Sequence, residues 1–192
     1  MKKQHIQAAQ YKVHSAQTLF ALAQVAFDQS ELRNCLGLAM KAVRKEPDHL
    51  GSWELVARSQ WRLGQFEEAL RTIDRLVSLN PYEPGYFYLR GMILQGLGQC
   101  GIAIEAMQRC LSFEDSPVAE QAMTALKELE QWQAVLIAEA LESDPVFRIQ
   151  YARNSFEACQ AKGFRLIVAE QSRIKARREA TVRSLHWTRN DS

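Results

Sequence analysis

The chain has 192 residues, 47% hydrophobic and 24% charged, a globular composition that excludes wholesale disorder. Its formal net charge of +2 gives no overall preference for nucleic acid or membranes. With 9 glycines and 5 prolines the sequence favours helices over a loop-rich β-sandwich. The sequence contains no run of 18 apolar residues, so a membrane span is not predicted.

The near-neutral total hides an uneven distribution of charge along the chain. Residues 1–16 carry +3 and residues 162–192 carry +5, whereas residues 17–161 carry −6. The sequence therefore predicts a mildly acidic body between two basic ends.

The first segment, residues 1–15, is expected to form a short N-terminal capping helix. Ile6, Ala9 and Val13 would share one face of this helix. No apolar run follows the lysines at its start, so a signal peptide is not expected.

From residue 16 onward the sequence repeats itself at a constant spacing of 34. The repeats cover residues 16–47, 50–81 and 84–115. Positions related by this period alternate between large and small side chains: Leu19, Trp53 and Phe87; Ala23, Ala57 and Gly91; Cys35, Ala69 and Ala103; Ala39, Ile73 and Met107. A large residue early in a first helix fills the space between helices, and a small residue four positions later lets a second helix approach. The period thus predicts a helix pair in each repeat.

The turns between the paired helices have their own signal. The period relates Ser30, Gly64 and Gly98 at the place where each first helix must stop. Glycine adopts the backbone conformation of such a turn at little cost. Pro47 and Pro81 are expected to follow the end of the second helix, which proline cannot continue.

The second repeat resembles the tetratricopeptide repeat family. The residues that carry the resemblance are Trp53, Ala57, Leu63, Gly64, Phe66, Ala69, Leu70 and Pro81. The resemblance implies an all-α fold, a right-handed superhelical stack of helix-turn-helix repeats with capping helices at both ends. It covers residues 16–115 and continues more weakly through 116–145, where we expect a fourth, degenerate repeat with a shortened second helix.

These expectations divide the chain into an N-terminal cap at 1–15, repeats at 16–145, and a C-terminal cap with a basic tail at 146–192. Two residues depart from the family pattern, because Arg90 and Gln60 stand where large apolar residues are usual. Arg90 is expected either to reach the rim of the groove or to pair with a buried acid.

The C-terminal cap is expected to begin with Asp144 as N-cap and Pro145 in the first turn, and to stop near Gly163. Phe147, Ile149, Tyr151, Phe156 and Cys159 follow, and the spacing of Phe147 and Tyr151, then Ser155, Phe156 and Cys159, gives an apolar stripe suited to docking on the last repeat. A final helix from about 166 to 186 carries the basic residues Arg173, Lys175, Arg177, Arg178 and Arg183. This helix has three interpretations: a solvated face, a segment folded back on the acidic body, or a contact for an acidic partner such as RNA or lipid headgroups.

Nothing in the sequence indicates catalysis. The four histidines show no metal-binding spacing, and the four cysteines, Cys35, Cys100, Cys110 and Cys159, lack a CxxC pair. We therefore expect buried thiols in a reducing compartment, no metal and no cofactor. The glycines at 96, 98 and 101 fall at a turn between helices with no strand before them, so they do not predict a nucleotide loop.

The family resemblance implies that the first helix of each repeat lines a concave groove. The residues expected there are Gln17, Phe20, Gln24, Phe27, Asp28, Glu54, Arg58, Trp61, Arg62, Tyr88, Met92 and Gln95. Trp, Tyr and Arg often carry binding energy, and Met adapts to varied apolar partners. The groove is thus expected to bind an extended or helical peptide. For the aromatic residues, packing in the core is an equal alternative.

Two further expectations concern the charge of the bound peptide. Arg58 and Arg62 could hold one acidic group together, or they could be offset by Glu54 and Glu68. The family's best-known groove holds the acidic tail of heat-shock chaperones with Lys, Asn and Arg. Here Phe20, Gln24 and Leu55 occupy the corresponding places, so recognition of a Glu-Glu-Val-Asp tail is not expected.

The sequence therefore predicts a non-catalytic, cytoplasmic interaction scaffold that acts as an adaptor or chaperone. One alternative is a protein similar to the chaperones of bacterial secretion systems. Another is a structural subunit docked in a larger complex through its basic ends. A minority alternative is a nucleic-acid-associated protein that works through the last helix.

Overall fold

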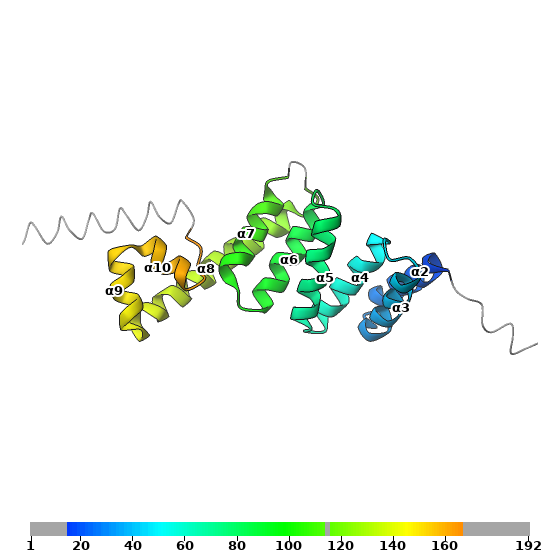
Figure 1. Cartoon of the computed structure of the whole chain (residues 1–192), viewed down its shortest axis with the longest axis horizontal. Helices are drawn as coiled ribbons and strands as arrows, with labels where there is room; N and C mark the ends of the chain where they lie inside the picture. Colours follow the sequence, from blue (N-terminus) through cyan, green and yellow to red (C-terminus); the bar gives the residue numbers. More distant parts are fainter. Residues whose placement is uncertain (1–14, 114–115, 167–192) are drawn as a thin grey trace, which may run out of the picture.

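The computed structural model describes residues 15–113 and 116–166, and these form a row of α-helices (Figure 1). In chain order they are α2 (Ala16–Asp28), α3 (Leu32–Lys45), α4 (Leu50–Arg62), α5 (Phe66–Leu79), α6 (Pro84–Gly96), α7 (Cys100–Leu111), α8 (Ala119–Ser143), α9 (Pro145–Arg153) and α10 (Ser155–Ala161). The all-α stack of helix pairs expected from the sequence is confirmed. The expected N-terminal cap and basic last helix lie outside the described residues, and no helix within the described part is long and apolar enough to span a membrane.

The first helices of the three repeats begin in the same way at positions related by the period. Ser15, His49 and Glu83 are their N-caps, and each side chain accepts a hydrogen bond from a backbone N–H of the first turn. The bonds measure 3.1 Å to Ser15 Oγ, 3.0 Å to His49 Nδ1 and 3.2 Å to Glu83 Oε1. Three different residue types therefore fill one structural role, because each offers an acceptor to N–H groups that the helix cannot satisfy itself.

The turns inside the repeats also follow the period. Gly64 and Gly98 have φ values of +74° and +73°, and Ser30 takes the same left-handed conformation with φ of 62°. Pro47 and Pro81 each stand directly after the C-cap of a second helix, as expected. The turn and stop signals read from the sequence are therefore confirmed at these positions.

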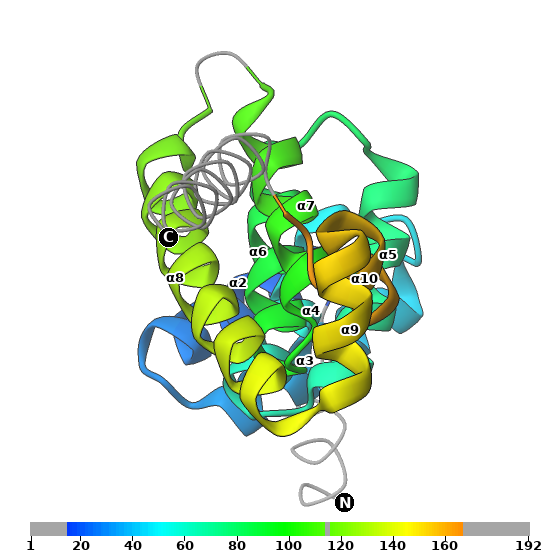
Figure 2. The same ribbon diagram turned by 90° about the vertical axis from the view of Figure 1, so that its left-hand side faces the viewer.

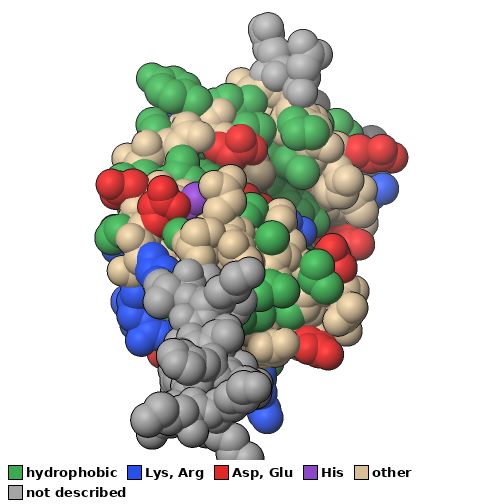
Figure 3. Space-filling view, turned by 90° about the vertical axis from the view of Figure 1, so that its right-hand side faces the viewer, with side chains coloured by type: hydrophobic (Ala, Val, Ile, Leu, Met, Phe, Trp, Pro, Cys, Tyr) green, Lys and Arg blue, Asp and Glu red, His purple; other side chains and the backbone are tan. Residues whose placement is uncertain are grey.

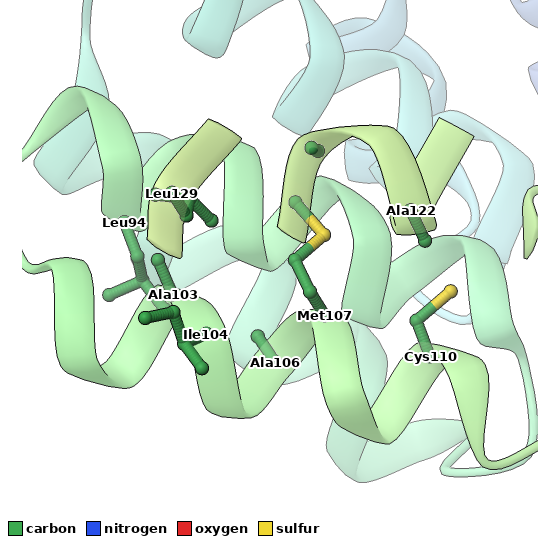
Figure 4. Close-up of a cluster of buried hydrophobic side chains, with 9 residues drawn as sticks. Leu94, Ala103, Ile104, Ala106, Met107, Cys110, Ala122 and Leu129 are labelled. Carbon is green, nitrogen blue, oxygen red and sulfur yellow. The ribbon is translucent and has the colours of Figure 1, made fainter. Parts of the chain in front are cut away.

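The core runs through the stack between successive helices, and its small residues allow close approach. Ala23 and Ala57 are fully buried. A Cβ atom at Gly91 would lie 2.7 Å from Met107 Cε, so the Met107 side chain, which packs against α6 here, would have to shift to admit a larger residue. Figure 4 shows Met107 in the cluster that joins α6 and α7 to α8, with Leu94, Ile104 and Leu129. All four cysteines are buried and free, as the sequence predicts.

The prediction of a fourth helix pair is wrong, because residues 119–143 form one continuous helix, α8, and not two helices joined by a turn. Its sequence contains no glycine or proline and is rich in the helix-forming Ala, Leu, Glu and Gln, so nothing ends the helix near its middle. The second half of α8 extends past α7 and is covered by α9 and α10 (Figure 2).

The C-terminal cap begins at the expected residue but contains an unexpected break. Asp144 Oδ1 accepts hydrogen bonds from the backbone N–H groups of Val146 and Phe147, at 2.9 and 3.0 Å. Asn154 ends α9 and caps α10, which splits the single expected helix into two. Of the expected apolar stripe, Phe147 and Cys159 are buried, whereas Phe156 remains 47% exposed; Ile149, outside the stripe, is 56% exposed.

The segment after α10 closes against α7 and α8. Gly163, with φ of +78°, ends the cap as expected. The fully buried side-chain amide of Gln133 donates to the backbone carbonyl of Arg165 at 2.9 Å and accepts from its N–H at 2.6 Å. Arg165 also forms an ion pair with Glu105 of α7. These contacts fix the chain as it leaves the cap.

Candidate functional groove

The helices α2, α4, α6 and α8 form one layer of the stack, since α2 contacts α4 and α6 contacts α8. Between α6 and α8 this layer is hollowed by a depression of about 360 Å³. Its lining consists of Tyr88 and Met92 from α6 and Glu120, Gln121, Thr124, Ala125 and Glu128 from α8. An apolar floor between two carboxylates can accept an apolar side chain that has a basic neighbour.

At the other end of the layer, Phe20 lies between repeats. Its ring lies 4.7 Å from the ring of His49, and a Cβ at Gly51 would come within 3.0 Å of it. Phe20 therefore fills the junction of α2 with the start of α4. Gln24, one turn further along α2, is exposed.

Phe27 brings the two predicted arginines together. The guanidinium groups of Arg58 and Arg62 each lie 5.1 Å from the centre of the Phe27 ring. Arg58 is also paired with Glu54 at 3.2 Å, and these two side chains are 47% and 39% exposed. The arginines thus share an aromatic platform across the first two repeats. Of the two acids named in the alternative interpretation, Glu54 lies beside Arg58, whereas Glu68 pairs with Arg71 at 3.1 Å.

Trp61 is half-buried against the core cluster of the second and third repeats. Its neighbour Gln60 is satisfied inside the repeat, because Thr72 Oγ1 lies 2.8 Å from Gln60 Oε1. A polar residue at this usually apolar position is therefore accommodated by a polar partner on α5. Gln95 follows Tyr88 and Met92 on α6 and is half-buried. Unlike those two residues, it does not line the hollow.

The α8 wall of the hollow was missed from the sequence, and a change of register explains why. Four residues separate α3 from α4 and α5 from α6, whereas seven separate α7 from α8. Buried residues of α8 match those of α6 at a spacing of 36: Ala122 with Tyr86, Ala125 with Leu89, and Leu129 with Ile93. The same spacing relates Thr124 and Glu128 to Tyr88 and Met92. The available signal was the lengthening of the period from 34 to 36 residues between α6 and α8.

Burial and charge also act on a tyrosine beneath this layer. Tyr86, only 6% exposed, has its pKa raised to about 12, mainly by burial and further by the nearby Glu54 and Glu83. Burial likewise raises the pKa of the Cys35, Cys100 and Cys110 thiols. Such protonated, enclosed thiols are poor nucleophiles. Within the described residues, no group of three His, Cys, Asp or Glu side chains is placed to bind a metal.

Comparison with known proteins gives two family matches. A tetratricopeptide repeat model matches residues 57–130, and a model of anaphase-promoting complex (cyclosome) subunit 3 matches residues 5–76. Curated protein sequences gave no significant match.

Solved structures share the fold at low sequence identity. The crystal structure of MamA is 17% identical, with a TM-score of 0.60 over 81% of this chain and 85% of that one. A tetratricopeptide repeat protein of Thermus thermophilus is 22% identical, with a TM-score of 0.55 over 77% and 84% of the two chains. The first such domain of Spaghetti (RPAP3), bound to the Hsp90 peptide SRMEEVD, is 21% identical, with a TM-score of 0.57 over 62% and 96%.

The constant period, the caps and turns that recur with it, the stacked helix pairs and the family match all agree. Residues 57–130 thus match the tetratricopeptide repeat family, and the described part of the chain is an all-α stack of tetratricopeptide-type helix pairs.

Proposed function

We propose that this protein is a non-catalytic interaction scaffold, an adaptor or chaperone, that holds a peptide segment of a partner on the layer formed by α2, α4, α6 and α8. The observation that carries the proposal is the hollow between α6 and α8, with its apolar floor and its two carboxylates. The peptide bound by the Spaghetti (RPAP3) domain supports this use of the fold. The four buried, free thiols suit a reducing compartment, so we place the protein in the cytoplasm.

The chemistry of the hollow favours a basic peptide. Tyr88 and Met92 offer apolar surface to one side chain of the partner, and Met92 can adapt its shape to that side chain. Glu120 and Glu128 stand two turns apart on α8, where they can pair with Lys or Arg next to the apolar anchor. An acidic tail such as the one at the end of SRMEEVD would meet like charge here. We therefore do not propose recognition of that kind of tail.

The test is binding of two labelled ten-residue peptides, measured by fluorescence anisotropy at low salt. One alternates Leu with Lys, and the other alternates Leu with Glu. We expect the basic peptide to bind and the acidic peptide to bind at least tenfold more weakly. The double variant Glu120→Gln/Glu128→Gln should weaken the basic peptide by roughly tenfold, since each exposed ion pair contributes about 0.2–1 kcal/mol.

The matched control is Glu139→Gln/Glu142→Gln, which removes the same charge from the far half of α8. This variant should change the dissociation constant less than twofold. Equal losses in both double variants would show only a non-specific charge effect and would refute the site. The same conclusion would follow if Met92→Ala left binding of the basic peptide unchanged.

A further inference from the structure

The outward face of α2 exposes apolar residues that have buried counterparts in the other repeats. Leu22 is 44% exposed, whereas Val56, one period later, is 1% exposed. Val25 is 52% exposed, whereas Ser59 and Ile93, at the same position of the next repeats, are fully buried. The same helix face is therefore open in the first repeat and closed in the second and third.

The cover in the later repeats is an α-helix, namely the second helix of the repeat before. Helix α3 packs on α4, and α5 packs on α6. Ser59 Oγ donates to Cys35 Sγ at 3.1 Å across the first of these contacts, and Arg90 Nε donates to Asp74 Oδ1 at 2.7 Å across the second. The partner of Arg90 is thus an acid, as one of the two expectations had it, but this acid is half-exposed and not buried. By the period, the open face of α2 is a place that receives a helix.

The same end of the molecule carries a hollow with an apolar floor and a basic rim. The hollow measures about 530 Å³ and lies between α2 and α3. Its lining consists of Leu19, Leu22, Leu38, Lys41, Arg44 and Lys45. Among the described residues no acid lines it, and none of the three cations has an ion pair. Figure 3, which views the molecule from this end, shows Lys and Arg gathered at one edge.

In the later repeats, the cation at the position of Lys41 lies on an aromatic ring. The distances from guanidinium to ring centre are 4.3 Å for Arg75 over Trp53 and 5.7 Å for Arg109 over Phe87. One period earlier, Leu19 stands in place of the ring. The first repeat therefore has the cation without the aromatic partner that occupies it elsewhere.

The other two cations of the rim have no basic counterparts. The period relates Arg44 and Lys45 to the uncharged residues Ser78 and Leu79 in the second repeat and Ser112 and Phe113 in the third. Helix α5 has no basic residue in its last turn, so the end of a second helix does not require such a cluster. The extra positive charge of the first repeat therefore favours an anionic partner.

We propose that the outward face of α2 and the hollow beside it bind an acidic amphipathic helix of another protein. The helical form follows from the cover of the later repeats, and the acidic character follows from the three cations. Apolar side chains of that helix pack on Leu22 and Val25 and enter the hollow, and Asp or Glu beside them pairs with Lys41 and Lys45. This site is separate from the hollow between α6 and α8, so it adds a second partner of opposite charge to the proposed function.

The leucines decide between the classes of anionic partner. Nucleic acids present phosphates and base edges, and these contacts do not need an apolar floor. A membrane surface takes up apolar side chains that project from a protein, whereas Leu19, Leu22 and Leu38 line a hollow. An apolar side chain of a helix can enter this hollow while carboxylates beside it reach the rim. A peptide therefore fits best.

The test is binding of a labelled helical peptide of about four turns, with Leu along one face and Glu on both flanks, measured by fluorescence anisotropy. Its leucines recur every three or four positions, so it presents an apolar face as a helix, which the alternating Leu–Glu peptide does not. We expect the full chain to bind it and Leu22→Gln to weaken binding at least fivefold. Lys41→Gln/Lys45→Gln should weaken binding about tenfold and reduce its dependence on salt.

Each variant has a matched control elsewhere in the stack. Leu79→Gln replaces a leucine of α5 that is 49% exposed, and Arg148→Gln/Arg153→Gln removes two exposed cations of α9. Both controls should change the dissociation constant less than twofold. Glu120→Gln/Glu128→Gln should also leave the acidic helix bound, since it alters only the other hollow. Failure at one site is therefore distinguishable from failure at the other.

Four results would each overturn the proposal. The first is absence of binding to the acidic helix at low salt, or equal losses in the variants and their controls. The second is a fall in Tm that is larger for Leu22→Gln than for Leu79→Gln, since the chain itself would then cover Leu22. The third is a dimer that Leu22→Gln converts into a monomer in light scattering, since the occupant would then be a second copy. The fourth is binding of RNA or of phosphatidylserine vesicles in place of the peptide.

Discussion

Replacing Gly101 with alanine should detach the segment that closes the C-terminal end of the stack. A Cβ atom at Gly101 of α7 would lie 2.3 Å from the backbone carbonyl oxygen of Gly163 and 3.3 Å from the backbone nitrogen of Arg165. Both atoms belong to the backbone, so no side-chain rotation relieves the clash. The segment must therefore move away, and the paired hydrogen bonds between Gln133 and Arg165 would break.

The size of the effect follows from these two bonds. Each contributes about 1 kcal/mol net, and the fully buried Gln133 amide adds up to ~2 kcal/mol more if it finds no other partner. Alanine returns about 1 kcal/mol through its better helix propensity. We therefore expect Gly101→Ala to lower the free energy of unfolding by about 1–3 kcal/mol, which is a fall in Tm of roughly 3–10 °C.

The assay compares thermal unfolding of two glycine-to-alanine variants by circular dichroism. Gly37 lies within α3, and a Cβ there would meet nothing within 4 Å. Gly37→Ala should therefore raise stability by about 0.5–1 kcal/mol. Hydrogen exchange at the Arg165 amide should become faster in Gly101→Ala only. If Gly101→Ala raised Tm as much as Gly37→Ala does, the close approach of α7 to residue 163 would be refuted.

Three further variants test the caps, the turns and the titration of buried groups. Ser30→Gly should raise the free energy of unfolding by about 0.5–1 kcal/mol, because the left-handed conformation at Ser30 costs a residue with a Cβ atom about 1–2 kcal/mol; a lower Tm would contradict this. Tyr86 keeps its proton in the folded state up to about pH 12, so its contribution is complete below pH 10 and is lost between pH 10 and about 12. In urea unfolding at these pH values, Tyr86→Phe should lack that loss, which amounts to about 2–3 kcal/mol. Asp144 has its pKa lowered, first by Lys162 and then by backbone N–H groups, so its contribution is present at neutral pH and is lost in acid. Asp144→Asn should be less stable than the parent at pH 7, and the difference should narrow as the pH falls below 3.8.

The parts of the fold that the sequence predicts are those with a local cause. A glycine at position 64 or 98 allows a turn by itself, and Asp144 followed by Pro145 starts a helix without help from distant residues. Repetition at a constant period then multiplies each weak local signal. Helix α8 also has a local cause, its lack of Gly and Pro, but the expectation of a further helix pair gave the wrong result there.

The parts that could not be predicted depend on contacts between distant residues. Gln133 and Arg165 are 32 positions apart, and no property of either residue indicates a paired hydrogen bond. The position of Arg58 and Arg62 over Phe27 likewise follows from how α4 crosses α2. For the groove, the sequence located the α6 wall, but the longer turn before α8 hid the carboxylates opposite it.

Arg90 shows that the unit of prediction in such a stack is a pair of residues and not a single residue. Taken alone it contradicts the apolar pattern, and it would be costly if it were buried without a partner. Taken with Asp74 on the preceding helix, it is an ion pair with 27% and 49% exposure, at a place where the rest of the repeat remains packed. Because each repeat contacts only its neighbours, such a pair can be exchanged for an apolar pair without altering the other repeats. Positions across a repeat boundary, at the spacings of the Asp74–Arg90 and Cys35–Ser59 contacts, should therefore vary together in tetratricopeptide repeat chains that share this register. Single charged residues at those positions should be found with their partner on the helix before.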